Sequence, residues 1–304
     1  MVAIFFCSTG RCATQALTSY FAENLGRSAI VEHEPLGARM NPRRALRHGN
    51  LGALRQSMPE IDRHFDRIAE ILASGQHYVD TGWPAYAWFP YLKEFLGDQF
   101  RWVHLVRNPL HVAASFVTHN FYDPVKHPQY TALACVQPTD PGVAYPEFAK
   151  EWGEFSIFEK CLYHWLETNR YAHDMAEVPG LTPIRTVHYQ RLFGSSATPL
   201  RELYGELGLG VPSIDQVRRV DKYRGHSEQQ STLRSQQLRQ EVGAVAARLG
   251  FMPAETDLAQ MPKLWRQYSS PWRDARGTGL KVAWRVLSSH IVRLAAPRRP
   301  RRKQ

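Results

Sequence analysis

The sequence is poor in cysteine and contains no long apolar run. Its 304 residues include four cysteines, at positions 7, 12, 135 and 161, and none forms a CxxC pair. Neither a disulfide scaffold nor a zinc knuckle is indicated, and a reducing compartment is expected. No stretch approaches the roughly 18 apolar residues that span a membrane. The N-terminus MVAIFFCSTG also lacks the basic start of a secretory signal. We therefore expect a cytoplasmic protein.

Two common catalytic signatures are also missing. The Walker A pattern GxxxxGK[ST] of ordinary ATP- and GTP-binding loops does not occur. This disfavours a kinase or another enzyme of nucleoside triphosphates. The 13 histidines form neither an HExxH motif nor a close cluster of ligands, so no metal is expected.

Positive charge is in excess, but it is concentrated at one end. The net charge is +10, and five of the positive charges lie in the last eight residues, PRRPRRKQ. The remaining excess is mild and suits an anionic small ligand rather than a nucleic acid. A nucleic-acid-binding module using this tail and the arginine-rich stretch 39–67 is the non-enzymatic alternative, and it would show strongly salt-dependent binding.

Short apolar runs alternate with helical patterns along the chain. Buried strands are predicted over residues 2–7, 29–32, 77–80, 101–106 and 184–188. Helical spacing follows the first strand and recurs over most of 42–74, 84–97, 155–166, 199–207 and 229–249. Strands that alternate with helices predict an α/β fold, in which helices cover both faces of a central parallel sheet.

Two stretches fall outside this alternation. Residues 122–147 contain five prolines, which predicts a loop or lid. We expect one domain over residues 1–275, followed over 276–304 by an amphipathic helix and the basic tail. The pattern over 280–303 also suggests peripheral contact with an anionic membrane surface. Packing of this helix on the body of the protein is the alternative.

The first chemical signal lies between the first strand and the first helix, where the sequence reads STGRCAT over residues 8–14. The free N–H groups and the dipole at a helix N-terminus bind phosphate-like anions. Arg11 adds a positive charge and Thr14 a hydroxyl. The loop is predicted to hold an anion, and a plain strand-to-helix turn is the alternative.

The second signal is Arg107-Asn108-Pro109 with Ser115 downstream. Arg107 follows a predicted strand directly, at the carboxyl end where open α/β sheets place ligands. Asn108 is a good helix cap, and Pro109 suits the first helical position. Ser115 lies less than two turns into that helix, so both side chains can reach one phosphate. A surface arginine and an ordinary helix serine are the alternative.

Together these two motifs resemble those of the sulfotransferases that use 3′-phosphoadenosine-5′-phosphosulfate (PAPS). STGRCATQAL is similar to their 5′-phosphosulfate loop. VRNPLHVAAS is similar to their 3′-phosphate motif, in which a serine follows an arginine by eight residues. The stretches YHWLETNR (163–170) and VHYQRLFGSSATPLRELYGELGL (187–209) agree with the family as well. The resemblance covers about residues 2–210.

The sequence departs from the family pattern in three places. Ala13 replaces a common glycine, and Gln190 stands where an acidic residue is frequent. The late basic segment of the family corresponds only loosely to residues 221–225. No role is assigned to that segment.

The resemblance implies a P-loop-NTPase-like three-layer fold and the transfer of a sulfuryl group from PAPS to a hydroxyl acceptor, without a metal. A carbohydrate or glycolipid acceptor is the first expectation, a small metabolite alcohol or phenol the second and protein tyrosine the third, selected by loops over 36–60 and 119–150. A kinase-like enzyme and a catalytically inactive nucleotide-binding scaffold are the alternatives. The residues implied in donor binding are Ser8, Thr9, Gly10, Arg11, Cys12, Ala13, Thr14, Gln15, Arg107 and Ser115.

Roles within this set also follow from the resemblance. Arg11 would stabilise charge on the leaving phosphate and so act in catalysis. Arg107 and Ser115 would bind the 3′-phosphate, which distinguishes PAPS from nucleotides that resemble ATP.

The general base is expected at the same edge of the sheet, in the sequence EHEP. The resemblance favours Glu34, because some family members place a glutamate near this strand. His33 is the second candidate, since an unperturbed histidine titrates near neutrality, and Asp80 is the third. The alternative is that Glu34 or His33 only caps a turn or binds Arg39. Farther along the chain, two aromatic residues in the sequence WPAY, at positions 83 and 86, suit either the core or an acceptor cleft.

Overall fold

The computed structural model describes residues 1–194, 196–210 and 233–269, and its centre is a five-stranded sheet. The strand order is β2-β3-β1-β4-β5, and every neighbouring pair is parallel. The parallel α/β fold predicted from the sequence is confirmed. Each predicted strand is present, as β1 (Ala3–Cys7), β2 (Ala29–Glu32), β3 (His77–Asp80), β4 (Phe100–Val106) and β5 (Arg185–His188).

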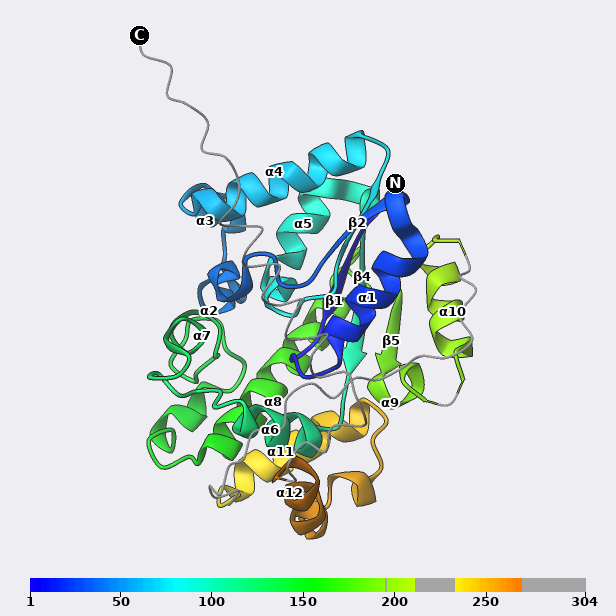
Figure 1. The fold of residues 1–304 in the computed structure, drawn as a ribbon. Helices are drawn as coiled ribbons and strands as arrows, with labels where there is room; N and C mark the ends of the chain where they lie inside the picture. The colour runs from blue at the N-terminus through cyan, green and yellow to red at the C-terminus, as the bar shows by residue number, and fades with distance from the viewer. Residues whose placement is uncertain (195, 211–232, 270–304) are drawn as a thin grey trace, which may run out of the picture. The chain divides into compact units, whose positions relative to one another are not determined.

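Helices cover both faces of this sheet (Figure 1). Side chains alternate between the two faces along a strand, and β1 is buried over its whole length. Ile4 and Phe6 pack in a core with α1 (Thr14–Leu25) and α10 (Thr198–Glu206). Phe5 packs in the core on the other face. That second core includes α4 (Pro59–Ala73), α5 (Phe89–Leu96), α6 (Pro109–Thr118) and α8 (Ile157–Ala176).

Prolines and caps break two stretches that the sequence predicts as longer helices. Residues 42–74 form α2 (Pro42–Ala45), α3 (Leu51–Gln56) and α4, and the Asn50 side chain caps α3. Residues 84–97 form a 3₁₀ helix, η3 (Pro84–Trp88), followed by α5. Pro90 explains this break, because proline has no N–H and clashes with the carbonyl four residues before it.

Other segments also differ in detail from the prediction. The proline-rich stretch 122–147 contains a short helix, α7 (Pro128–Leu133). Helix α11 (Gln236–Arg248) begins later than predicted, because Ser235 caps it. Two further helices are α9 (Tyr189–Leu192) and α12 (Met261–Ser269).

The helix and basic tail predicted over 276–304, and the loosely matched segment 221–225, lie outside the described residues. None of the helices in the described part of the chain is long and apolar enough to cross a bilayer.

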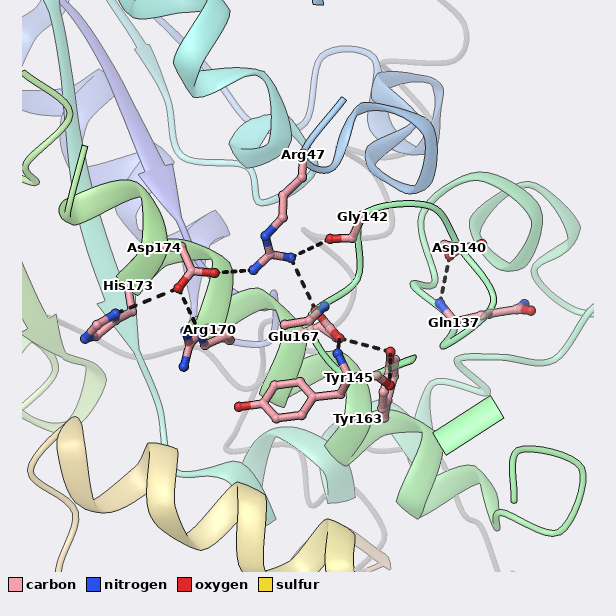
Figure 2. A network of polar contacts seen from close by, with 11 residues as sticks. Arg47, Gln137, Asp140, Gly142, Tyr145, Tyr163, Glu167, Arg170, His173 and Asp174 are labelled. Atoms are coloured by element: carbon pink, nitrogen blue, oxygen red, sulfur yellow. Dashed lines mark hydrogen bonds and ion pairs between the residues drawn. The ribbon is translucent and has the colours of Figure 1, made fainter. Parts of the chain in front are cut away.

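A buried carboxylate fastens the segment before residue 146 to α8 (Figure 2). The side chain of Glu167 is fully buried. Its Oε1 accepts hydrogen bonds from the Tyr145 N–H (2.8 Å) and the Tyr163 hydroxyl (3.0 Å), and its Oε2 accepts one from the Ala144 N–H (3.0 Å). Burial raises the pKa of Glu167, and these donors oppose that rise.

Arg47 completes this network from the other side (Figure 2). One guanidinium nitrogen lies 3.6 Å from Glu167 and donates to the Gly142 carbonyl at 2.8 Å, while another forms an ion pair with Asp174. The network therefore connects three segments that are distant in sequence, and it anchors part of the stretch predicted as a lid.

We expect Glu167→Leu to lower the free energy of unfolding by about 2–4 kcal/mol, because it removes the acceptor of the buried Tyr145 N–H, the buried Tyr163 hydroxyl and the partly buried Ala144 N–H. Asp174→Asn is the matched control, since Asp174 is partly exposed and its loss should cost about 1 kcal/mol or less. Urea denaturation measures both. Equal losses in the two variants would contradict a structural role for the buried carboxylate.

Candidate active site

The loop between β1 and α1 has a constrained backbone that packs closely against two aromatic side chains. Three of its residues adopt positive φ angles: Gly10 (78°), Arg11 (57°) and Ala13 (56°). A Cβ at Gly10 would lie 3.0 Å from the Trp83 ring and 3.2 Å from the Phe116 ring, so a glycine is needed there. Helix α1 begins without a side-chain cap, which leaves N–H groups of its first turn for an anion.

Two guanidinium groups meet at this loop. Arg107 follows β4 and is only 7% exposed. It donates a hydrogen bond to the Arg11 carbonyl, and its guanidinium lies 4.3 Å from the centre of the Tyr189 ring. The Arg11 Nε donates to the Ser115 hydroxyl at 2.9 Å, and its Nη2 lies 3.0 Å from Nε2 of His119. The structure thus brings Arg11, Arg107 and Ser115 into one cluster.

These two positive charges are not neutralised within the described part of the chain. No Asp or Glu of residues 1–194, 196–210 and 233–269 forms an ion pair with Arg11 or Arg107. Burial lowers the pKa of Arg11, and the nearby charge of Arg107 lowers it further. Burying unpaired like charges is costly, so the cluster fits a ligand that carries several negative charges.

His119 belongs to the same cluster. Burial, followed by the charge of Arg11, lowers the pKa of His119 to about 4. The imidazole is therefore neutral near pH 7 and adds no third positive charge. The sequence held a signal for this residue, because His119 lies one helical turn after Ser115 and so on the same face.

The predicted cap of α6 is confirmed. The Asn108 side chain accepts hydrogen bonds from the N–H groups of Leu110 (2.9 Å) and His111 (3.3 Å), and Pro109 is the first residue of the helix. The Asn108 amide also donates to the Glu255 carbonyl at 2.7 Å. Asn108 therefore fixes the chain where it leaves β4, by binding both the first turn of α6 and the backbone at Glu255.

A second chain of polar contacts begins at the same loop. The Thr14 hydroxyl lies 2.9 Å from Nε2 of His33, which is 3.7 Å from a carboxylate oxygen of Glu34. The other oxygen of Glu34 accepts a hydrogen bond from the Tyr130 hydroxyl at 2.8 Å. Burial lowers the pKa of His33, with Glu34 opposing and Arg11 adding to the shift. Both candidate bases thus lie beside the loop, and His33 is neutral near pH 7.

Asp80, the third candidate base, holds the turn that carries Glu34. Its Oδ1 accepts hydrogen bonds from the N–H groups of Gly82 (2.7 Å) and Glu34 (3.3 Å). Glu34 has a φ of 51°, and a Cβ at Gly82 would lie 2.5 Å from the Glu34 nitrogen. Asp80 is 1% exposed, and burial raises its pKa to about 7. In this structure Asp80 fixes the backbone of Glu34.

The two segments expected to select the acceptor contact each other next to Glu34. Helix α7, which carries Tyr130, packs against η2 (Gly37–Met40). Arg43 forms a two-pronged ion pair with Asp140, at 2.8 Å from Nε and 2.6 Å from Nη2. The segments 36–60 and 119–150 are therefore tied together at the edge where both candidate bases lie.

Several predicted residues lie in the core or away from the charged cluster. Trp83 and Tyr86 are buried, at 4% and 0% exposed, and the Trp83 ring packs edge-on against His164 at 5.1 Å. This placement fits the core alternative for both aromatic residues. Cys12 is fully buried, which raises the pKa of its thiol. Gln15 is exposed on α1.

No family model matches the sequence, and no curated protein matches it. Solved structures of sulfotransferases are similar to it. A sulfotransferase domain from the curacin biosynthetic pathway has a TM-score of 0.48 and 15% identity, over 83% of this chain and 98% of that domain. The sulfotransferase domain of the Synechococcus PCC 7002 olefin synthase has a TM-score of 0.42 and 14% identity, over 97% and 95%. A sulfotransferase from Alicyclobacillus acidocaldarius has a TM-score of 0.45 and 12% identity, over 88% and 99%.

These structures come from the family whose motifs the sequence resembles. Their TM-scores lie below 0.5 and their identities are 12–15%, so they carry no argument about activity. Among the described residues, no three His, Cys, Asp or Glu side chains lie together as metal ligands would.

The raised pKa of Asp80 predicts a specific dependence of stability on pH. The folded protein binds more protons than the unfolded chain between the ordinary carboxyl pKa of 3.8 and about 7. Stability should therefore fall as pH rises through that range. Asp80→Asn keeps the acceptor oxygen and removes this dependence, so the difference between variant and wild type should grow by up to about 4 kcal/mol from pH 4 to pH 8.

Urea unfolding at a series of pH values measures this difference. The control is Asp98→Asn, since the Asp98 side chain is fully exposed and its loss should leave the profile unchanged. A parallel pair of profiles for wild type and Asp80→Asn would show that Asp80 is ionised normally in the folded state.

Proposed function

We propose that this chain is a sulfotransferase that moves a sulfuryl group from PAPS to a hydroxyl acceptor. The observation that supports this most is the pair of guanidinium groups, Arg11 and Arg107, which lie at an open helix N-terminus without a carboxylate partner among the described residues. PAPS carries anionic groups at both its 5′ and 3′ positions. A site with two separate cations and free backbone N–H groups matches that distribution of charge.

The proposal gives each residue of the cluster a task. The loop after β1, with Thr14 and the Arg11 side chain, would bind the 5′-phosphosulfate. Arg107 and Ser115 would bind the 3′-phosphate. Ser115 accepts a hydrogen bond from Arg11, so the two halves of the site are already joined. Binding of the donor would replace this contact with contacts to phosphate oxygens.

Sulfuryl transfer resembles phosphoryl transfer in what it needs from a protein, namely positioning and stabilisation of charge. The acceptor oxygen forms a bond to sulfur while the bond from sulfur to the phosphate oxygen breaks. Arg11 would stabilise the charge that develops on that phosphate. Glu34 or His33 would take the proton of the acceptor hydroxyl, and the neutral imidazole of His33 supports its candidacy.

A hydroxyl of a carbohydrate or glycolipid is the proposed acceptor. The contact between Tyr130 of α7 and Glu34 supports a role for the segment 119–150 on the acceptor side. The position of Glu34 beneath this segment supports it as the base. A kinase-like enzyme would need a Walker lysine, which the loop lacks.

Calorimetric titration tests the donor site. We expect the spent donor, 3′-phosphoadenosine-5′-phosphate, to bind much more tightly than adenosine-5′-phosphate. Arg107→Ala should weaken binding of the spent donor by about 10- to 100-fold, which is the loss of affinity expected when hydrogen bonds to a charged group are removed. Its effect on adenosine-5′-phosphate should be small, because that ligand lacks the 3′-phosphate.

Arg39→Ala is the matched control, since Arg39 pairs with Glu60 on the surface away from the Arg11–Arg107 cluster. It should change neither affinity. Equal binding of the two nucleotides to the wild-type protein would overturn the proposed function.

The base is tested by transfer of labelled sulfate from PAPS to a panel of carbohydrate and glycolipid acceptors. We expect Glu34→Gln or His33→Ala to lower kcat by about 10²- to 10⁴-fold, the usual contribution of general base catalysis. Affinity for the spent donor should stay within about twofold of the wild-type value. If the wild-type protein binds the donor but sulfates no member of the panel, the inactive scaffold becomes the better account.

A further inference from the structure

Arg107 is held by groups from three separate segments. Its guanidinium donates to the Arg11 carbonyl and lies over the Tyr189 ring. The third contact comes from α12, where the Tyr268 hydroxyl accepts a hydrogen bond from Nη2 of Arg107 at 2.8 Å. The sequence resemblance ends near residue 210, so it assigns nothing to Tyr268.

The placement of Tyr268 follows from the pattern of α12. Met261, Leu264 and Tyr268 are buried in the core on one face of this helix, at the spacing of successive helical turns. Helix α12 packs against α6. Because this packing fixes the ring, the Tyr268 hydroxyl is held within hydrogen-bonding distance of Arg107. It also lies 3.2 Å from Nδ1 of His111 in α6.

The usual partner of a buried arginine is a carboxylate, whereas the partner that α12 offers Arg107 is the phenol of Tyr268. It accepts a hydrogen bond and so limits the rotation of the guanidinium, but it adds no negative charge. The positive charge of Arg107 therefore stays available to an anion. An Asp or Glu at this position would fix the guanidinium equally well and would repel the same anion.

We propose that Tyr268 is a positioning residue that holds the Arg107 guanidinium in the orientation that binds the 3′-phosphate, and thereby sets the preference for a 3′-phosphorylated nucleotide. This inference rests on the proposed function, in which Arg107 binds that phosphate. Tyr268 acts through Arg107 and is distinct from the residues that contact the transferring group.

The test uses Tyr268→Phe, which keeps the ring and its packing and removes only the hydroxyl. Affinities for 3′-phosphoadenosine-5′-phosphate and adenosine-5′-phosphate are measured by calorimetry on the full chain. We expect the first affinity to fall about tenfold, as for one hydrogen bond to a charged group. The second should stay unchanged, so the preference for the 3′-phosphate falls by the same factor.

Tyr171→Phe is the matched control. It also removes a buried phenol hydroxyl, but that hydroxyl contacts the Ala87 carbonyl rather than the cluster. It should leave both affinities unchanged. A second comparison places Tyr268→Phe in an Arg107→Ala background, where it should cause no further loss if it acts only through Arg107.

Five outcomes would overturn the inference. Equal loss of both affinities in Tyr268→Phe would mean a general structural role. Tighter binding of the 3′-phosphorylated nucleotide would mean that Tyr268 occupies the place of the phosphate. A full additional loss in the Arg107→Ala background would mean that Tyr268 acts independently of Arg107. A wild-type preference for the 3′-phosphate that Tyr268→Phe leaves intact would overturn this inference alone. Wild-type protein without that preference would overturn the proposed function as well.

Discussion

The hydrogen bond from Arg107 to the Arg11 carbonyl joins the two halves of the candidate site. It connects the side chain at the end of β4 to the backbone of the loop after β1, and these strands are neighbours in the sheet. The same contact brings two guanidinium groups together in a largely buried setting. Like charges repel more strongly there than in water, so an anion between or beside the two guanidinium groups would stabilise the arrangement. The multiply charged ligand proposed for the candidate site rests on this one constraint.

The rest of the edge is shaped by tight backbone packing. Gly10 lies against Trp83 and Phe116, and Gly82 lies against the backbone of Glu34. Neither glycine position has room for a side chain. The loops after β1, β2 and β3 therefore pack closely against one another and against the core. Asp80 then fixes the left-handed turn at Glu34. The left-handed backbone at Glu34 is thus held in place by the buried Asp80 carboxyl group.

Much of the site was predictable because it depends on local patterns. The loop at 8–14, the capped helix after Arg107 and the polar residues after β2 each follow a strand, and parallel strands end at a common edge. His119 carried a weaker signal, one helical turn beyond Ser115. Tyr130 and Tyr268 carried none, because they reach the site through helices α7 and α12, whose positions depend on packing between distant segments. The break at Pro90 could have been predicted from the proline alone.

The sequence by itself determined the parallel α/β fold, the order of the two candidate anion-binding motifs and the choice of candidate bases, since apolar periodicity, helix caps and strand ends are local properties. Tertiary structure decided which polar groups meet. It placed Arg11 on Ser115 and His119, Glu34 against Tyr130, and Arg107 between Tyr189 and Tyr268. These partners lie up to 161 residues apart. Such contacts depend on how helices pack on the sheet, and no local pattern in the sequence encodes that packing.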